Sequence, residues 1–290
     1  MKDFCYRIFC GFFLGISIFA PGVSGSVMAI MMGIYPRLLG IVSNPFKNLK
    51  KNIAYLFPMG IGALISFIFF ILVFGYLFET YEKATYLLFI GLMAGNLPVV
   101  FKDANQDGFK KRYLFGIIGA FLVTAWVGIS VIGAEDRAIS TGYLALSGTV
   151  TGAASMVPGM SISMLLMLFG VYEYLMGGAH TMMSAFRETL SFASFDFAML
   201  LNFAVFGGVF VAGMVAFSNF TKFIFKRYHN FAYFMVFGFM CGCLVGICYR
   251  LQFLDNTGFN WLIGALMLAL GLSISFLFVY LGKKFNVDEK

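Results

Sequence analysis

Residues 15–40 read GISIFAPGVSGSVMAIMMGIYPRLLG, and residues 152–177 read GAASMVPGMSISMLLMLFGVYEYLMG. Aligned without gaps, the two stretches are identical at nine of their 26 positions. Both contain Pro-Gly-x-Ser-x-Ser, and a Gly-aliphatic-Tyr triplet begins twelve residues after each proline. A duplicated, helix-breaking polar motif inside an apolar sequence is typical of a transporter's binding site.

Composition places the chain in a membrane. Hydrophobic residues make up 61% of the 290 positions, charged residues make up 11%, and the mean hydropathy is +0.90. These values predict a polytopic membrane protein. The net charge of +7 is interpreted as a topology signal in the loops, so no nucleic-acid partner is expected.

Enzymatic chemistry is not predicted. The two histidines, His180 and His229, fall in predicted loops on opposite faces, which leaves no plausible catalytic triad or metal site. The five cysteines lie in apolar stretches without zinc or disulfide spacing. No nucleotide-binding motif is present, so we expect neither a cofactor nor direct coupling to ATP.

The hydropathy pattern predicts two similar halves, residues 1–138 and 139–290. Each half is expected to hold a Pro-Gly-broken re-entrant helical hairpin followed by three transmembrane helices. In the first half the hairpin covers about residues 5–42, and the helices cover about 53–78, 84–101 and 113–133. In the second half the hairpin covers about 142–178, and the helices cover about 195–221, 231–250 and 260–282.

Basic residues predict that the two halves are inverted. With a returning hairpin and three spans, each half crosses the membrane an odd number of times, so the second half starts on the opposite side. This model gathers fifteen Lys and Arg residues on one side and four on the other. Because cytoplasmic loops are rich in Lys and Arg, both termini are expected in the cytoplasm.

The motif residues are the candidate substrate site. Proline removes a backbone donor and glycine permits a sharp turn, so backbone groups there need partners other than a continuous helix. The serines that follow would open the next helix, where free N–H groups and hydroxyls favour an anion. The candidates are Pro21, Gly22, Ser24, Gly25, Ser26, Pro158, Gly159, Ser161 and Ser163. Close packing of helices through small residues is the alternative.

Four further residues lie just beyond the motif. Tyr35 and Tyr172 could hydrogen-bond a ligand or anchor the membrane interface. Arg37 is a candidate contact for an anionic head group, although snorkelling to the membrane surface also explains it. Glu173 is a candidate proton-coupling residue, because an ionisable group in an apolar segment is costly to place there.

The paired motifs resemble those of the bacterial polyprenyl-phosphate transporters, over about residues 8–282. The resemblance implies a flippase that returns undecaprenyl phosphate, the lipid carrier of cell-wall synthesis, from the outer to the cytoplasmic leaflet of the bacterial cytoplasmic membrane. Three positions depart from the usual pattern of that family. Val27 stands where members often have threonine, Pro36 where an acidic residue commonly follows the first tyrosine, and Ile162 where a second glycine is frequent.

The sequence therefore predicts a transporter whose opposed motifs bind the phosphate head group of a polyprenyl phosphate in the bilayer. A transporter of a small soluble anion, coupled to protons or sodium, is the alternative. A membrane scaffold in which the motif serves only helix packing is a third interpretation.

Overall fold

The computed structural model describes residues 2–286 except 22–24, 26–27, 30–31, 44–46, 107, 132–138, 156, 158–159, 190–195, 253 and 255–258. The described residues form α-helices and contain no β-strand. The helices are α1 (Lys2–Phe19), α3 (Tyr35–Ser43), α4 (Leu49–Ala104), α5 (Tyr113–Val131), α6 (Thr141–Ala154), α7 (Ile162–Leu168), α8 (Tyr172–Thr189), α9 (Phe197–Arg227), α10 (His229–Arg250) and α11 (Trp261–Asn286).

Six stretches among the described helices are long and apolar enough to cross a membrane. They are Leu49–Phe78, Thr80–Ala104, Tyr113–Val131, Phe197–Phe217, His229–Arg250 and Trp261–Leu281. The prediction of an all-helical, multi-pass membrane protein is therefore confirmed for the described part of the chain. The division at residues 138 and 139 stays a prediction, and residue 138 lies outside the described residues.

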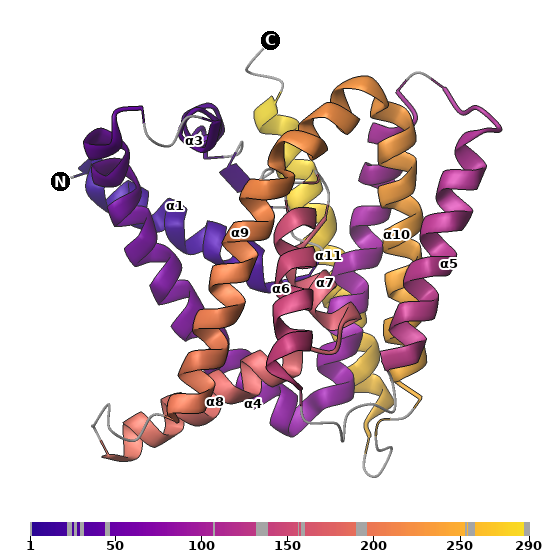
Figure 1. The fold of residues 1–290 in the computed structure, drawn as a ribbon. Helices are drawn as coiled ribbons and strands as arrows, with labels where there is room; N and C mark the ends of the chain where they lie inside the picture. The colour runs from indigo at the N-terminus through magenta and orange to yellow at the C-terminus, as the bar shows by residue number, and fades with distance from the viewer. Residues whose placement is uncertain are drawn as a thin grey trace.

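α4 contains two of these spans. At Tyr81 the backbone has φ −137° and ψ 48°, outside the helical region, and the chain bends there. In Figure 1 the first part of α4 runs down, the second part runs up, and α5 runs down again. α9, α10 and α11 run up, down and up, so the three spans after one motif point opposite to the three spans after the other.

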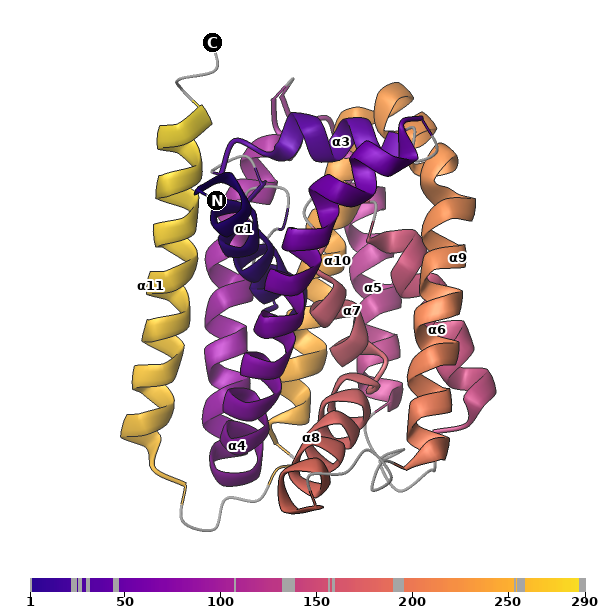
Figure 2. The same cartoon turned by 90° about the vertical axis from the view of Figure 1, so that its left-hand side faces the viewer.

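The shorter helices lie toward opposite faces. α1 runs inward from the face that carries both chain ends, and α3 lies back at that face (Figures 1 and 2). α6 runs inward from the opposite face, where α8 also lies. α7 and α8 enclose an angle of 105° across a short break. The largest core cluster joins residues of α1, α6, α7 and α8 to α4 and α10, among them Phe89, Met164, Tyr172 and Met240.

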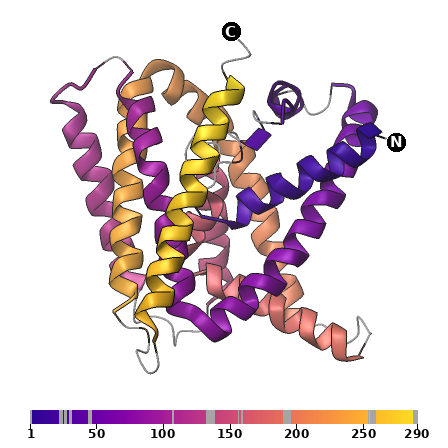
Figure 3. The same ribbon diagram turned by 180° about the vertical axis from the view of Figure 1, so that it is seen from behind.

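The helix contacts of one half resemble those of the other. α5 packs along α10, and α11 packs along the second part of α4, as Figure 3 shows for α11. α1 packs on the first part of α4, and α6 packs on α9 in the corresponding way. Glycines permit close approach at these crossings. A Cβ atom built on Gly62 would lie 1.9 Å from the Ile8 carbonyl oxygen, and one built on Gly213 would lie 2.3 Å from that of Thr149. Small residues at such crossings let membrane helices approach closely.

This packing predicts that Gly213→Ala destabilises the protein and Gly207→Ala does not. Both glycines lie in α9, but a Cβ atom on Gly207 would meet no atom within 4 Å. The new methyl group at position 213 would push α6 and α9 apart, at a cost of about 1–3 kcal/mol. We expect a lower midpoint of thermal unfolding in detergent for Gly213→Ala alone. Equal midpoints for the two variants would contradict the close crossing of α6 and α9.

Candidate functional site

The two Gly-aliphatic-Tyr triplets form the same turn. Gly33 has φ 63° and Gly170 has φ 65°, in the left-handed region that favours glycine. In each copy the amide of the next residue donates to the carbonyl five positions earlier, at 3.0 and 2.9 Å. This is the 6→1 bond of a Schellman motif, which ends one helix. The following tyrosines, Tyr35 and Tyr172, begin α3 and α8.

A second tyrosine fastens each turn to the preceding helix. The Tyr6 hydroxyl in α1 donates to the Met32 carbonyl at 2.7 Å. The Tyr143 hydroxyl in α6 donates to the Phe169 carbonyl at 2.8 Å. Both the donors and the acceptors are separated by 137 residues, the spacing of the duplicated motif. The two copies therefore share a hydrogen bond from a tyrosine side chain to the backbone, as well as a sequence.

The turn predicts that Gly33→Ala lowers stability more than Gly40→Ala. A Cβ atom on either glycine would meet no atom within 4 Å, so the two substitutions differ mainly in backbone conformation. Only Gly33 has a positive φ, which costs a residue with a side chain roughly 1–2 kcal/mol. Thermal unfolding in detergent measures the difference. The left-handed turn would be contradicted if Gly33→Ala were as stable as Gly40→Ala.

The serines of the second copy are buried and bonded to one another. The Ser161 and Ser163 hydroxyl oxygens are 2.8 Å apart, and the side chains are 6% and 0% exposed. Ser161 is the residue before α7, and its side chain does not cap that helix. The pair therefore forms a small polar patch within the apolar core, where hydroxyl groups can accept and donate.

The first copy meets the second beside its proline. The Tyr172 hydroxyl donates to the Phe19 carbonyl at 3.3 Å, and Pro21, two residues further on, is buried. A Cβ atom on Gly25 would lie 3.0 Å from the Ser17 hydroxyl oxygen, so this region is tightly packed. The end of α1 and the start of α8 are thus in direct contact. Five other motif candidates, Gly22, Ser24, Ser26, Pro158 and Gly159, lie outside the described residues.

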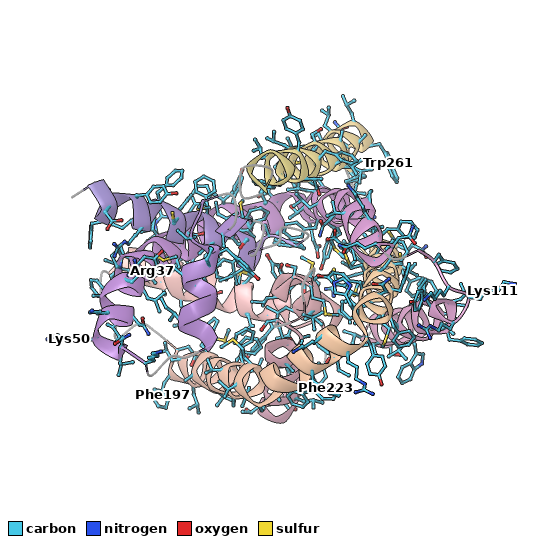
Figure 4. All side chains as sticks on the ribbon, turned by 90° about the horizontal axis from the view of Figure 1, so that it is seen from above. Arg37, Lys50, Lys111, Phe197, Phe223 and Trp261 are labelled. Carbon is cyan, nitrogen blue, oxygen red and sulfur yellow. The ribbon has the colours of Figure 1, made fainter. Side chains whose placement is uncertain are left out.

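Arg37 lies away from α7, at the face that carries the chain ends. Figure 4 places it near Lys50 and far from Lys111. Its guanidinium carbon is 3.9 Å from the centroid of the Tyr55 ring, and that of Arg7 is 4.6 Å from the same ring. Both distances are within the range of cation–π attraction. The structure therefore groups Arg37 with α1 and the start of α4, and not with the two buried serines.

Glu173 has two partners that the sequence did not suggest. The Tyr86 hydroxyl donates to Oε1 of Glu173, and Nη2 of Arg250 lies 3.8 Å from its Oε2. The Arg250 guanidinium carbon is also 5.4 Å from the centroid of the Tyr86 ring. In the sequence, Arg250 counted only as one of the four basic residues on the side opposite the termini, with Lys83, Arg137 and Arg187. Its position at the end of an apolar span was the available signal, but its partners were not predictable.

A metal centre is not indicated by the side chains that the structure describes. No group of three or more His, Cys, Asp and Glu residues among them could hold an ion. The structure shows two separate polar groups, the hydroxyl pair of Ser161 and Ser163 and the cluster of Tyr86, Glu173 and Arg250. Such groups can bind an anion through hydrogen bonds and charge, but they offer no activated nucleophile.

The known proteins that this chain resembles all carry names for the transport of polyprenyl phosphates. A family model described as undecaprenyl phosphate translocase-like matches residues 14–255. A polyprenyl-phosphate transporter of Staphylococcus aureus is 25% identical over 280 residues, covering 93% of this chain and 94% of that protein. A polyprenyl-phosphate transporter of Vibrio cholerae is 26% identical over 247 residues, covering 81% of this chain and 74% of that protein. No solved structure matches the chain. The relatives are named as transporters and not as enzymes, which agrees with the class predicted from the sequence.

Proposed function

We propose, since this chain belongs to the undecaprenyl phosphate translocase-like family, that it moves undecaprenyl phosphate from the outer to the cytoplasmic leaflet of the bacterial cytoplasmic membrane. The observation that carries the proposal is the contact between the two motif copies. Tyr172 of the second copy donates to Phe19 beside the first, and the buried Ser161–Ser163 pair lies close by in the chain. A head group passing between the copies would meet polar groups from both.

The lipid's chemistry fits this arrangement. Its phosphate must be shielded from hydrocarbon, while the polyprenyl tail can stay in the bilayer. A protein therefore needs only a short polar path for the head group. In this proposal the path is formed by Pro21, Gly22, Ser24, Gly25 and Ser26 of the first copy and by Pro158, Gly159, Ser161 and Ser163 of the second.

An inverted repeat would give the path two alternating openings. Three observations support it: the opposite directions of corresponding spans, the left-handed turns at Gly33 and Gly170, and the matching hydrogen bonds of Tyr6 and Tyr143. Rocking of the two halves about the contact between the motifs would then expose the phosphate to one leaflet at a time. Each motif would form a re-entrant hairpin entering from its own side.

Orientation follows from the basic residues. The face with the chain ends is assigned to the cytoplasm because the loops on that side hold most of the Lys and Arg. These residues are Lys2, Arg7, Lys47, Lys50, Lys51, Lys102, Lys110, Lys111, Arg112, Lys222, Lys226, Arg227, Lys283, Lys284 and Lys290. In this orientation Arg37, with Tyr35 nearby in the chain, would meet the phosphate as it reaches the cytoplasmic leaflet. Proton coupling through Glu173 stays a prediction.

The proposal is tested by removing the two buried hydroxyls. Purified protein is reconstituted into liposomes, and undecaprenyl phosphate arriving in the outer leaflet is measured with a phosphatase that cannot cross the bilayer. Ser161→Ala/Ser163→Ala should slow the transfer at least about tenfold, because a hydrogen bond to a charged group contributes roughly 1.5–3 kcal/mol. Ser147→Ala is the matched control, since that hydroxyl is buried but bonded only within α6, to the Leu144 carbonyl at 2.9 Å.

Two results would count against the proposal. Wild-type protein that leaves the lipid in its original leaflet would exclude the flippase. A double variant that folds and transfers the lipid at the wild-type rate would exclude the serines from the path. If inorganic phosphate competed as well as the lipid, a transporter of a small soluble anion would be the better description.

A further inference from the structure

The cluster of Tyr86, Glu173 and Arg250 joins three helices. Tyr86 is in α4, Glu173 opens α8, and Arg250 ends α10, so both halves of the chain contribute. The Tyr86 side chain is 1% exposed, that of Arg250 is 11% exposed and that of Glu173 is 26% exposed. Charges so withdrawn from water are costly and in membrane segments commonly mark a substrate or ion pathway. The cluster is therefore a candidate for more than a structural role.

The carboxylate of Glu173 is held unevenly. Tyr86 donates to Oε1, whereas Oε2 accepts no hydrogen bond from any residue that the structure describes. The nearest guanidinium nitrogen of Arg250 is 3.8 Å from Oε2, well beyond the roughly 2.7–2.9 Å of a charge-assisted hydrogen bond. The carboxylate thus neutralises the guanidinium without closing a bidentate pair. An anion of better shape could take its place.

A phosphate has that shape. Guanidinium donors match two phosphate oxygens in a planar fork, and a phosphate monoester carries more negative charge than a carboxylate. The ring of Tyr86 lies against the Arg250 guanidinium, which orients the fork. A small cavity beside the pair is lined by both side chains and by the glycines of the α5–α10 crossing, Gly128 and Gly246. This cavity has room for about one water molecule, about 10 Å³, so a phosphate bound there requires the side chains around the guanidinium to move apart.

The position of the cluster suits a loading site. Arg250 is at the end of a membrane span, on the face opposite the chain ends. Under the orientation proposed above this is the outer-leaflet side. Met167 and Leu168 of α7 line the same cavity, and the other end of that helix begins after Ser161. A phosphate bound at Arg250 would thus lie one short helix away from the buried serines.

We propose that Arg250 binds the phosphate of the incoming lipid, and that Glu173 occupies the guanidinium as an internal anion when no phosphate is present. The inference rests on the proposed function and adds the residue that first captures the head group. On binding, phosphate replaces Glu173 at Arg250, while Glu173 keeps its hydrogen bond from Tyr86. The exchange avoids leaving a buried guanidinium without an anion at any stage.

Opposite shifts in phosphate affinity test this exchange. Full-length protein in detergent is titrated with farnesyl phosphate and, separately, with inorganic phosphate. Arg250→Gln should weaken binding at least about tenfold through loss of a charged donor, and Arg250→Lys should fall in between because it keeps charge without the fork. Glu173→Gln should tighten binding several-fold, because the competing carboxylate is gone. Arg187→Gln, an exposed arginine in the last turn of α8, is the control and should match wild type.

Folding is controlled by a second variant. Arg250→Gln alone leaves a partly buried carboxylate without its cation and can destabilise the protein. Arg250→Gln/Glu173→Gln removes both charges together, so it should fold and still bind phosphate weakly. Wild-type affinity in this double variant would overturn the proposal. Weaker phosphate binding by Glu173→Gln would also overturn it. If the ion pair were merely structural, removing either Glu173 or Arg250 would weaken phosphate binding.

The two proposals fail in different ways. If wild-type protein moves undecaprenyl phosphate in liposomes but the Arg250 variants bind farnesyl phosphate normally, the flippase stands and the role of Arg250 is wrong. If both phosphates bind equally well and depend on Arg250, but no lipid is moved, the phosphate site stands and the flippase is wrong. Failure of wild-type protein to bind either phosphate would overturn both.

Discussion

In hydrocarbon, every backbone amide and carbonyl needs a partner within the protein. This constraint explains the turn that the two motif copies share. A helix that ends inside the protein leaves carbonyls without partners, and the left-handed glycines Gly33 and Gly170 let the chain satisfy some of them by a Schellman bond. The hydroxyls of Tyr6 and Tyr143 satisfy the neighbouring carbonyls. These bonds hold both turns, and in the second copy the turn follows α7, the short helix that begins after the buried Ser161.

Close helix crossings surround these turns. The hydrophobic effect contributes little to the packing of one apolar helix on another in lipid, so packing depends on close van der Waals contact. Glycine supplies that contact where α1 crosses α4, where α6 crosses α9 and where Gly128 of α5 faces Gly246 of α10. The last crossing also borders the cavity beside Arg250. The same small residues thus bring the helices into close contact and border the water-sized cavity next to the charged cluster.

Features encoded locally were predictable from the sequence. Hydropathy indicated the apolar spans. The Gly-aliphatic-Tyr triplets were visible as a repeat, but the sequence alone did not predict that each forms a turn after which α3 or α8 begins. The partners of Glu173 were not predictable, because Tyr86 is 87 residues away and a single sequence does not show which helix faces which. For Arg37, the positive charge suggested contact with a phosphate head group. In the structure its guanidinium lies over the ring of Tyr55, which Arg7 also contacts.

The two copies differ most in charge, and the difference bears on direction. At the spacing of 137 residues, Glu173 corresponds to Pro36. The later spans align at a spacing of 147 residues, which pairs Gly91 with Gly238 and Arg250 with Asp103. A guanidinium toward one face and a carboxylate toward the other would give phosphate unequal affinity at the two ends of the path. Unequal affinity alone cannot accumulate lipid in one leaflet, because a passive carrier leaves the equilibrium unchanged. It can favour capture at the Arg250 end and release at the Asp103 end. Net flow in that direction then requires consumption of the lipid phosphate on the release side or a coupled ion.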